Sequence, residues 1–298
     1  MIMTISSYVQ GGLGNQMFQY AIARSLAEHY QTDFILDCSW FEAFEKNVTP
    51  RALELQKLNI TLLVDQIQKP LTNTKKILTG LQTLLNYGPI IKKQRNAFDF
   101  DPSIYHLKNV DKRGLHLYGY WQSFRYYEHI KSILQNEFKP LDPLPDVYRC
   151  YEEKILSTES VMVHIRRGDY VHSESAAKFH GALSMNYYSE AIHLALKISP
   201  NVHFFIFSDD LDWAKESLPN NLNLTFIEAD EKVKSGPHEL YLMTQCTHHI
   251  IANSSFSWWG AWLKKENIGS VFAPSHWISD NTQDLSNLLP KNWIQLKA

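Results

Sequence analysis

The second half of the chain alternates short apolar runs with longer amphipathic segments, and this alternation limits the available folds more than any other feature. Apolar runs that predict buried strands lie at 161–165, 203–207, 224–228, 248–252 and 270–273. Helical periodicity fills the gaps at 186–198, 211–217, 238–246 and 256–266. Strands that alternate with helices form a parallel sheet covered by helices on both faces. We therefore expect an α/β fold.

The first half opens in the same way. Residues 4–9 predict a short strand, 15–30 a helix and 33–37 a second strand, with a glycine-rich loop at 11–16. This order is the first unit of a doubly wound sheet. In the helix, one face collects apolar residues at three- and four-residue spacing, and Gln19, Arg24 and Glu28 fall away from it. Weaker patterns predict helices at 51–58, 74–86 and 125–138 and a strand within 114–123.

The best boundary in the chain is the segment 139–146, which holds three prolines in the sequence KPLDPLPD. Proline cannot continue a helix or a central strand, so this segment predicts an extended linker. A length of 298 residues also suits two domains. We therefore expect an N-terminal α/β domain over 1–145 and a C-terminal one over 146–298.

Composition excludes several functional classes. A net charge of −2 argues against broad nucleic-acid binding, which usually needs a basic face. Three widely spaced cysteines show neither a disulfide framework nor the spacing of a metal site, so we expect reduced thiols. The N-terminus lacks the features of a signal peptide, and no apolar run is long enough to span a membrane. These observations predict a cytoplasmic protein without an integral membrane segment.

The strand at 161–165 ends in an unusual cluster of charges, with the sequence VHIRRGDY at 163–170. Since side chains alternate along a strand, His164 and Arg166 project on the same side. An arginine at the carboxyl end of a buried strand is costly unless it meets an anion. An ion pair of Arg166 or Arg167 with Asp169 is the structural alternative. The tripeptide 167–169 also matches cell-adhesion ligands, but those need an exposed loop tip on a secreted protein.

A second candidate anion site follows the strand at 248–252. Ser254, Ser255 and Ser257 cluster where the next helix is expected to begin. Free backbone N–H groups and the positive end of the helix dipole favour an anion at such a position. Ordinary capping of the helix by serine is the structural alternative.

The glycine loop GGLGNQ at 11–16 allows close approach of a ligand to the backbone. It partly matches a dinucleotide-binding fingerprint, because Gly12 and Gly14 follow a strand and Asp37 ends the next one. Met17, however, occupies the place of the third glycine, where a bulky residue keeps helix and strand apart. A dinucleotide-dependent oxidoreductase is therefore a weak alternative.

Taken together, four stretches resemble the signature blocks of glycosyltransferase family 11, the α-1,2-fucosyltransferases, in their bacterial form. They are GGLGNQMFQYA (11–21), LYGYWQS (117–123), HIRRGDY (164–170) and LYLMTQCTHHIIANSSFSWWGAWL (240–263). The resemblance implies a GT-B-like fold of two facing Rossmann-like domains with parallel sheets. It also implies transfer of L-fucose from GDP-β-L-fucose, with inversion and without a metal or other cofactor, to the 2-hydroxyl of a terminal galactose. The acceptor would be an O-antigen or lipopolysaccharide oligosaccharide, and peripheral association with the inner membrane would be compatible with that role.

The resemblance also assigns donor contacts. Arg166 would grip the diphosphate, which suits the planar fork of a guanidinium, and His164 would lie beside the nucleotide. Glu239 would read guanine, although aspartate is the more usual residue there. The remaining donor contacts implied are Gly14, Asn15, Ser208, Ser254, Ser255 and Phe256.

The catalytic base and the acceptor contacts are less defined. Candidate bases are Asp169, His172 and Glu174, which follow the arginines, and Asp169 is also expected to orient Arg166 or Arg167. Trp121, Tyr170 and His172 are expected to contact the acceptor, although buried core positions are the usual place for such aromatics. Two alternatives to the fucosyltransferase remain besides the oxidoreductase. One is a nucleotide-sugar transferase of another linkage, and the other is a non-catalytic glycan-binding module.

Overall fold

The computed structural model of the chain describes residues 5–42, 51–60, 67–68, 89–168, 181–228, 232–265, 268–279 and 283–298. The chain divides into two compact units, Met1–Glu137 and Phe138–Ala298. Each unit is built on a parallel sheet, as the alternation of strands and helices predicts.

The first unit contains a five-stranded sheet in the order β3-β2-β1-β5-β4, and every pairing in it is parallel. Its strands are β1 (Ile5–Tyr8), β2 (Phe34–Asp37), β3 (Ile67–Gln68), β4 (Ile90–Lys93) and β5 (Leu115–Tyr118). Its α-helices are α1 (Leu13–Tyr30), α3 (Val110–Arg113) and α4 (Lys131–Glu137). Short 3-10 helices are η1 (Ser39–Glu42), η2 (Leu55–Lys57), η4 (Pro102–His106), η5 (Phe124–Tyr126) and η6 (Glu128–Ile130).

Helix α1 is buried on more than one side, so the prediction of a polar face for this helix is partly wrong. Gln16 and Gln19 are fully buried. Gln19 accepts a hydrogen bond from the backbone of Gln10 at 2.9 Å and donates one to the Gly119 carbonyl at 3.2 Å. A buried amide is stable only when such bonds are made, and here they join Gln10, just before the glycine loop, to the turn after β5. Periodicity alone could not show these long-range partners.

Several expected elements differ in extent. The strand within 114–123 is only β5, because Gly119 (φ +152°) and Trp121 (φ +54°) take backbone conformations that end it. The helix expected at 125–138 is instead η5, η6 and α4 in succession. The helix expected at 51–58 is reduced to η2, and the one expected at 74–86 lies outside the described residues.

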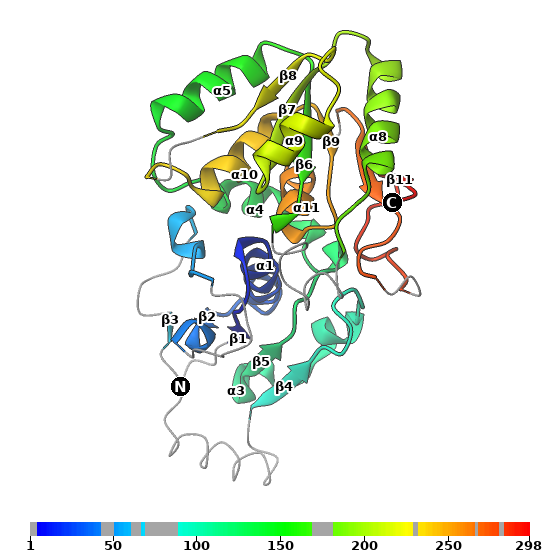
Figure 1. Ribbon diagram of the computed structural model, residues 1–298. Helices are drawn as coiled ribbons and strands as arrows, with labels where there is room; N and C mark the ends of the chain where they lie inside the picture. Colours follow the sequence, from blue (N-terminus) through cyan, green and yellow to red (C-terminus); the bar gives the residue numbers. More distant parts are fainter. Residues whose placement is uncertain are drawn as a thin grey trace. The chain divides into compact units, whose positions relative to one another are not determined.

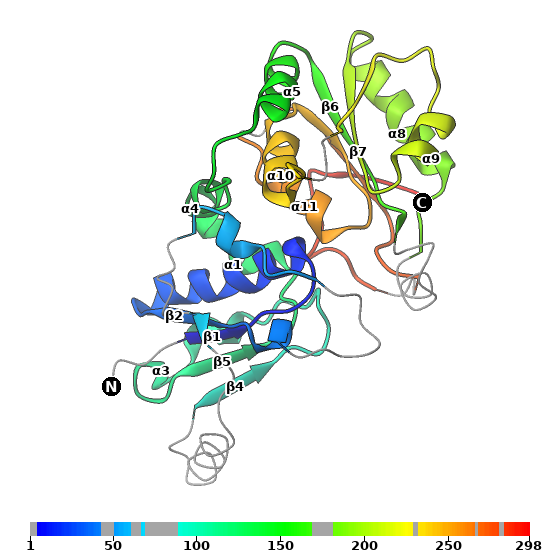
Figure 2. The ribbon, with the colours of Figure 1, turned by 60° about the vertical axis from the view of Figure 1, so that its left-hand side comes forward.

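The second unit contains a six-stranded parallel sheet, β6 (Ser160–Ile165), β7 (His203–Ser208), β8 (Leu224–Phe226), β9 (His248–Ile250), β10 (Val271–Pro274) and β11 (Ile294–Leu296). The sheet order is β11-β10-β9-β6-β7-β8. Counted from β6 as the first strand, this is the Rossmann order 3-2-1-4-5-6. The helices are α5 (Asp146–Leu156), α8 (Met185–Ile198), α9 (Leu211–Ser217), α10 (Gly236–Gln245) and α11 (Ser255–Trp262). Within this unit, α8 and α9 lie on one face of the sheet and α5, α10 and α11 on the other (Figures 1 and 2).

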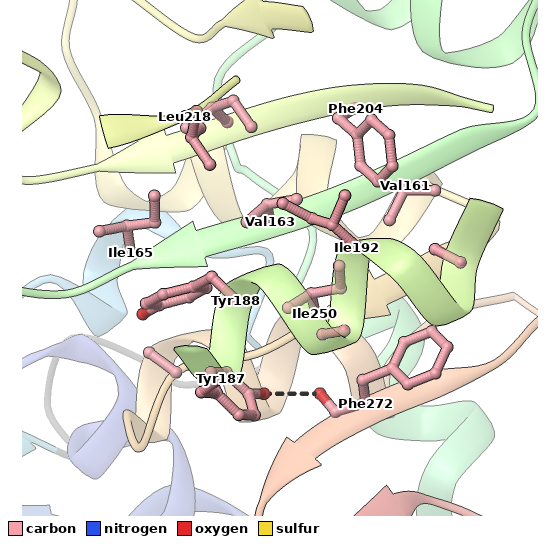
Figure 3. Close-up of a cluster of buried hydrophobic side chains, with 14 of the residues drawn as sticks. Val161, Val163, Ile165, Tyr187, Tyr188, Ile192, Phe204, Leu218, Ile250 and Phe272 are labelled. Atoms are coloured by element: carbon pink, nitrogen blue, oxygen red, sulfur yellow. Dashed lines mark hydrogen bonds between the residues drawn. The ribbon is translucent and has the colours of Figure 1, made fainter. Parts of the chain in front are cut away.

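One face of β6 packs into the hydrophobic core, and the other face carries His164 of the candidate site. Val161, Val163 and Ile165 are fully buried in a cluster with α8. Figure 3 shows this cluster, in which the hydroxyl of Tyr187 donates to the Phe272 carbonyl at 3.2 Å. The alternate residues of β6 project from its other face. The core therefore fixes the register that presents His164, and Arg166 after it.

The proline-rich segment belongs with the second unit. The ring of Phe138 packs against Trp259 of α11 at 5.1 Å, and His238 Nε2 lies 3.4 Å from the Asp142 carbonyl oxygen. The chain therefore passes from one unit to the other at Glu137 and Phe138, whereas the proline pattern placed the division after residue 145. Helix α5, which follows the prolines, was not expected from the sequence.

Candidate active site

The carboxyl ends of β6 and β9 flank the topological switch point of the second sheet. From β6 the chain adds β7 and β8 on one side, then returns to place β9 on the other. Open parallel sheets bind their ligands at this crevice. Arg166 follows the end of β6, and Ser254 lies four residues after the end of β9. The two predicted anion sites therefore belong to the strands on either side of the switch point.

Arg166 is held by an acidic residue that the sequence patterns did not indicate. Its Nη1 lies 2.9 Å from Oδ2 of Asp209, which directly follows β7. The other oxygen of that carboxylate accepts a hydrogen bond from the backbone N–H of Arg167 at 2.8 Å. Both side chains of the ion pair are about one quarter exposed, at 23% and 24%. The carboxylate thus fixes the guanidinium while leaving part of it open to solvent.

Arg167 is held separately. Its guanidinium lies 3.9 Å from the ring centroid of Trp213, and its Nε donates to Oδ2 of Asp210 at 3.3 Å. Asp210 also caps α9 by accepting from the Trp213 N–H at 3.2 Å. These contacts anchor the start of the tripeptide 167–169 to β7 and α9. That geometry does not suit an exposed adhesion loop.

Gly168 is required by the same arrangement. A Cβ atom on this residue would lie 2.6 Å from Oδ2 of Asp209. Any side chain here would push the carboxylate away from Arg166.

Asp209 could be linked to Arg166 from sequence only through the strand order, because 43 positions separate the two residues and β6 pairs with β7.

Helix α11 begins with Ser254 as its N-cap, as the capping alternative requires. Its Oγ accepts from the N–H of Phe256 at 3.3 Å, and Ser254 is 8% exposed. Ser257 Oγ is turned inward and donates to the carbonyls of Ala252 and Ser254 at 3.4 and 3.3 Å. Two of the three serines therefore serve the helix itself. Ser255 and Phe256 are half-buried in the first turn, where N–H groups favour an anion.

His164 lies between the Arg166–Asp209 ion pair and the first turn of α11. Its ring centroid is 6.0 Å from that of Phe256, and the side chain is 5% exposed. Burial lowers the pKa of His164 to about 4; the charge of Arg166 also lowers it, and Asp209 opposes this effect. The imidazole is therefore neutral near pH 7. Its Nδ1 is buried without a hydrogen-bond partner among the described residues, which suits a polar group kept for a ligand.

Ser208 and Glu239 lie on elements that reach the same edge. Ser208 ends β7 in register with Ile165, and its Oγ accepts from the Asp210 N–H at 2.9 Å. Glu239 is half-buried in the first turn of α10, which follows β8 and so starts from the carboxyl side of the sheet. Its charge contributes to the raised pKa of Tyr148, after burial.

The remaining predicted residues lie either in the first unit or outside the described residues. Gly14 and Asn15 lie in the first turn of α1, at the carboxyl edge of the first sheet, and Asn15 Oδ1 accepts from Gln122 Nε2 at 2.9 Å. Trp121 packs inside the first unit, 3% exposed and edge-on to Tyr126. Four predicted residues lie outside the described residues, namely Asp169, Tyr170, His172 and Glu174.

Comparison with solved structures identifies the fold. The chain superposes on the crystal structure of POFUT1 in complex with GDP with a TM-score of 0.50, covering 90% of this chain and 98% of that one at 15% identity. The fold is the GT-B-like α/β type of glycosyltransferases, as expected. The chain belongs to glycosyltransferase family 11, whose profile matches residues 4–297.

Curated relatives agree with that assignment. The chain is 32% identical to an α-1,2-colitosyltransferase of Escherichia coli, covering 96% of this chain and 97% of the relative. It is 30% identical to the O-antigen biosynthesis glycosyltransferase WbnK of Escherichia coli, covering 97% and 99%. It is 23% identical to galactoside α-(1,2)-fucosyltransferase 2 of Hylobates lar, covering 85% and 67%. The protein is therefore a glycosyltransferase, which removes the oxidoreductase and the non-catalytic binding module from consideration.

Three further observations concern the general expectations. The cysteines are free thiols, with Cys38 and Cys246 buried and Cys150 exposed. Within the described part of the chain, no group of three or more histidine, cysteine or acidic side chains is arranged to hold a metal ion. Among the helices that the structure describes, none is both long and apolar enough to cross a membrane.

Proposed function

We propose that this protein transfers L-fucose from GDP-β-L-fucose to the 2-hydroxyl of a terminal galactose, on an oligosaccharide of the O-antigen type. The observation that carries the proposal is the position of Arg166. Its guanidinium and the first turn of α11 follow the two strands that flank the switch point of a Rossmann-type sheet. Family membership supports the sugar-nucleotide donor, and the relatives named for O-antigen biosynthesis and galactoside α-(1,2)-fucosylation support the acceptor and the linkage.

The chemistry asked of this site is stabilisation of the leaving diphosphate. The galactose 2-oxygen forms a bond to the anomeric carbon of fucose as the bond from that carbon to the β-phosphate oxygen breaks. The electron pair leaves with GDP, and the proton of the hydroxyl passes to a base. Arg166 supplies a fixed cation for the developing charge, and the N–H groups in the first turn of α11 add to it. Asp169, His172 and Glu174 remain the predicted candidates for the base.

The nucleotide is expected to contact His164. A neutral, buried imidazole with a free ring nitrogen can hydrogen-bond to a nucleobase, ribose or phosphate without adding charge. Ser208, Glu239, Gly14 and Asn15 remain predicted donor contacts. Independence from metal ions and from other cofactors also remains a prediction.

One specific observation favours a second donor. The relative at 32% identity is named as a colitosyltransferase, and colitose is fucose without its 3-hydroxyl. Transfer of colitose from GDP-colitose to the same position would use the same leaving group and the same arginine. The two donors differ by one hydroxyl, whose partner in the site decides between them.

The test is a matrix of donors and acceptors in EDTA. GDP-fucose, GDP-colitose and GDP-mannose are each incubated with lactose, N-acetyllactosamine and methyl β-galactoside, and the product linkage is determined by NMR. We expect an α-1,2-linked product from GDP-fucose on galactose-terminated acceptors. Product only from GDP-colitose would select the second donor, and a linkage to another hydroxyl would refute the assigned regiochemistry.

A further inference from the structure

The first sheet presents a row of four in-register side chains at its carboxyl edge. Asp37, Tyr8, Tyr118 and Lys93 are the last residues of the neighbouring strands β2, β1, β5 and β4. Tyr8 pairs with Asp37, and Lys93 pairs with Tyr118. Across four adjacent strands, the row therefore consists of an acidic residue, two aromatic residues and a basic residue.

The four side chains project from the same face of the sheet. In-register neighbours in a sheet point to the same side, and residues two positions apart on one strand do so as well. Two positions before the tyrosines, Ser6 Oγ and His116 Nδ1 lie 2.8 Å apart, which confirms this shared face across β1 and β5. The tyrosine rings themselves lie 5.7 Å apart between centroids, inclined by 35°.

The row is accessible and chemically mixed. Asp37, Tyr8 and Tyr118 are half-buried and Lys93 is exposed, whereas the residues before them on the other face, Leu36 and Leu117, are 1% exposed. The Asp37 carboxylate accepts a hydrogen bond from the Ser39 N–H at 3.1 Å, which keeps it at the edge. Burial raises the pKa of Tyr118, and the charge of Asp37 raises it further, so the phenol keeps its proton as a hydrogen-bond donor.

The row lies at the switch point of its own sheet. The chain builds β1, β2 and β3 outward on one side and then places β5 and β4 on the other side of β1. Tyr8 and Tyr118 therefore end the two strands that flank this point, where open parallel sheets bind ligands. The donor residues of the second unit, Arg166 and His164, occupy the equivalent position in their own sheet.

We propose that Asp37, Tyr8, Tyr118 and Lys93 form the platform that binds the acceptor sugar. This inference rests on the proposed function and names the acceptor site for it. The tyrosine pair offers apolar ring faces for the C–H face of a hexose. The carboxylate accepts from sugar hydroxyls at one end, and the ammonium donates to them at the other. Three strand spacings separate the ends, roughly 14 Å, which spans a neutral mono- or disaccharide.

The platform differs from the acceptor contact that the sequence suggested on this unit. Trp121 was expected to stack on a sugar, but it is buried. The backbone turns at Gly119 and Trp121, and the exposed ring after β5 is instead Tyr120, which is 38% exposed. The residues that follow β2, Trp40 and Phe41, are half-buried aromatics near the Asp37 end of the row.

The test compares acceptor kinetics with donor kinetics. Asp37→Asn keeps the shape and the bond to Ser39, but it loses the charge. We expect the acceptor KM to rise about 10-fold or more, as for loss of a hydrogen bond to a charged group. Hydrolysis of GDP-fucose in the absence of acceptor should stay within about twofold of wild type. Asp33→Asn is the matched control, because Asp33 is exposed just before β2 at the amino edge of the same sheet.

Tyr118→Ala and Lys93→Ala extend the test along the row. Both should weaken the saturation-transfer NMR signal of lactose with the GDP-bound protein, while Tyr30→Phe, a change at the far end of α1, should not. Unchanged acceptor KM and lactose signal in Asp37→Asn, Tyr118→Ala and Lys93→Ala would overturn the platform. That result leaves wild-type transfer intact, whereas failure of the proposed function would appear as absence of transfer by the wild type itself.

Discussion

The ion pair between Asp209 and Arg166 makes a demanding prediction, because two opposing effects meet there. Asp209 holds Arg166 with a 2.9 Å contact and the backbone of Arg167 with a 2.8 Å hydrogen bond. The same negative charge repels the diphosphate that Arg166 is proposed to bind. Removing Asp209 would therefore free the arginine for a ligand but would also let it move. The structure predicts that the loss of position outweighs the loss of repulsion.

The free energies involved support the expectation that losing the position of Arg166 outweighs losing the repulsion. The pair is about one quarter exposed, so its net contribution to stability is only about 1 kcal/mol, and the bond to Arg167 adds about 1 kcal/mol. The fold should tolerate that loss. A misplacement of about 1 Å at a catalytic cation costs up to about 10²-fold in rate, or about 2.7 kcal/mol. We therefore expect kcat to fall about 10-fold in Asp209→Asn, which keeps an acceptor for Arg167, and about 10²-fold in Asp209→Ala.

Measuring both GDP affinity and kcat separates an effect on the position of Arg166 from an effect on nucleotide binding. The affinity for GDP, measured by calorimetry, should change less than about threefold in Asp209→Ala, since weaker repulsion offsets the lost order, while kcat falls. Gly168→Ala should reproduce the effect without removing any charge, because its Cβ would displace the carboxylate. Asp212→Asn, an exposed change in the first turn of α9, is the control. An unchanged or raised kcat in folded Asp209→Ala would refute the positioning role.

Three further predictions concern His164, metal ions and Gln16. Because the pKa of His164 lies at about 4 in the folded state against an ordinary 6.5, the unfolded chain binds the proton first as pH falls. The burial of neutral His164 should therefore contribute a loss of unfolding free energy on the order of 3 kcal/mol as pH falls from 6.5 to 4. His249, whose pKa is also lowered by burial, adds to the same fall, so His164→Gln should make that part of a denaturant titration series shallower without abolishing it. Saturating EDTA should leave transfer unchanged, and loss of activity that magnesium or manganese restores would contradict metal independence. Gln16→Leu should destabilise the protein by about 3–5 kcal/mol in urea unfolding, because Gln16 hydrogen-bonds Gly11, Ala52, Glu54 and Leu55 from a fully buried position.

The parts of the fold predicted from sequence are those whose signal is local. Strand β6 is a largely apolar run, and its alternation correctly predicted that His164 lies on the face opposite Val161, Val163 and Ile165. Strands β3, β4 and β11 were missed. Both β4 and β11 are short, are half-exposed or exposed over most of their length, and lack an apolar run. Their position at the edges of the sheets explains the weak pattern.

The parts of the site that escaped prediction depend on distant pairing or on a single dihedral angle. Asp209 meets Arg166 only because β6 and β7 are neighbours, which no local pattern reports. Which of the two rings is exposed, Tyr120 or Trp121, depends on the positive φ at residue 121. That backbone conformation leaves Tyr120 exposed and Trp121 buried, the reverse of what was expected. The row from Asp37 to Lys93 needs the order of four strands, so it becomes visible only in the folded sheet.

The central claim is that Arg166 belongs to a binding site for a guanosine diphosphate sugar. Its most direct test is calorimetric titration of the wild type and of Arg166→Ala with GDP, GDP-fucose and NAD in EDTA, followed by turnover of both proteins. The account predicts that GDP and GDP-fucose bind to the wild type, that NAD does not, and that Arg166→Ala loses at least about 10²-fold in turnover. Binding of NAD without GDP, or near-normal turnover by a folded Arg166→Ala protein, would contradict it.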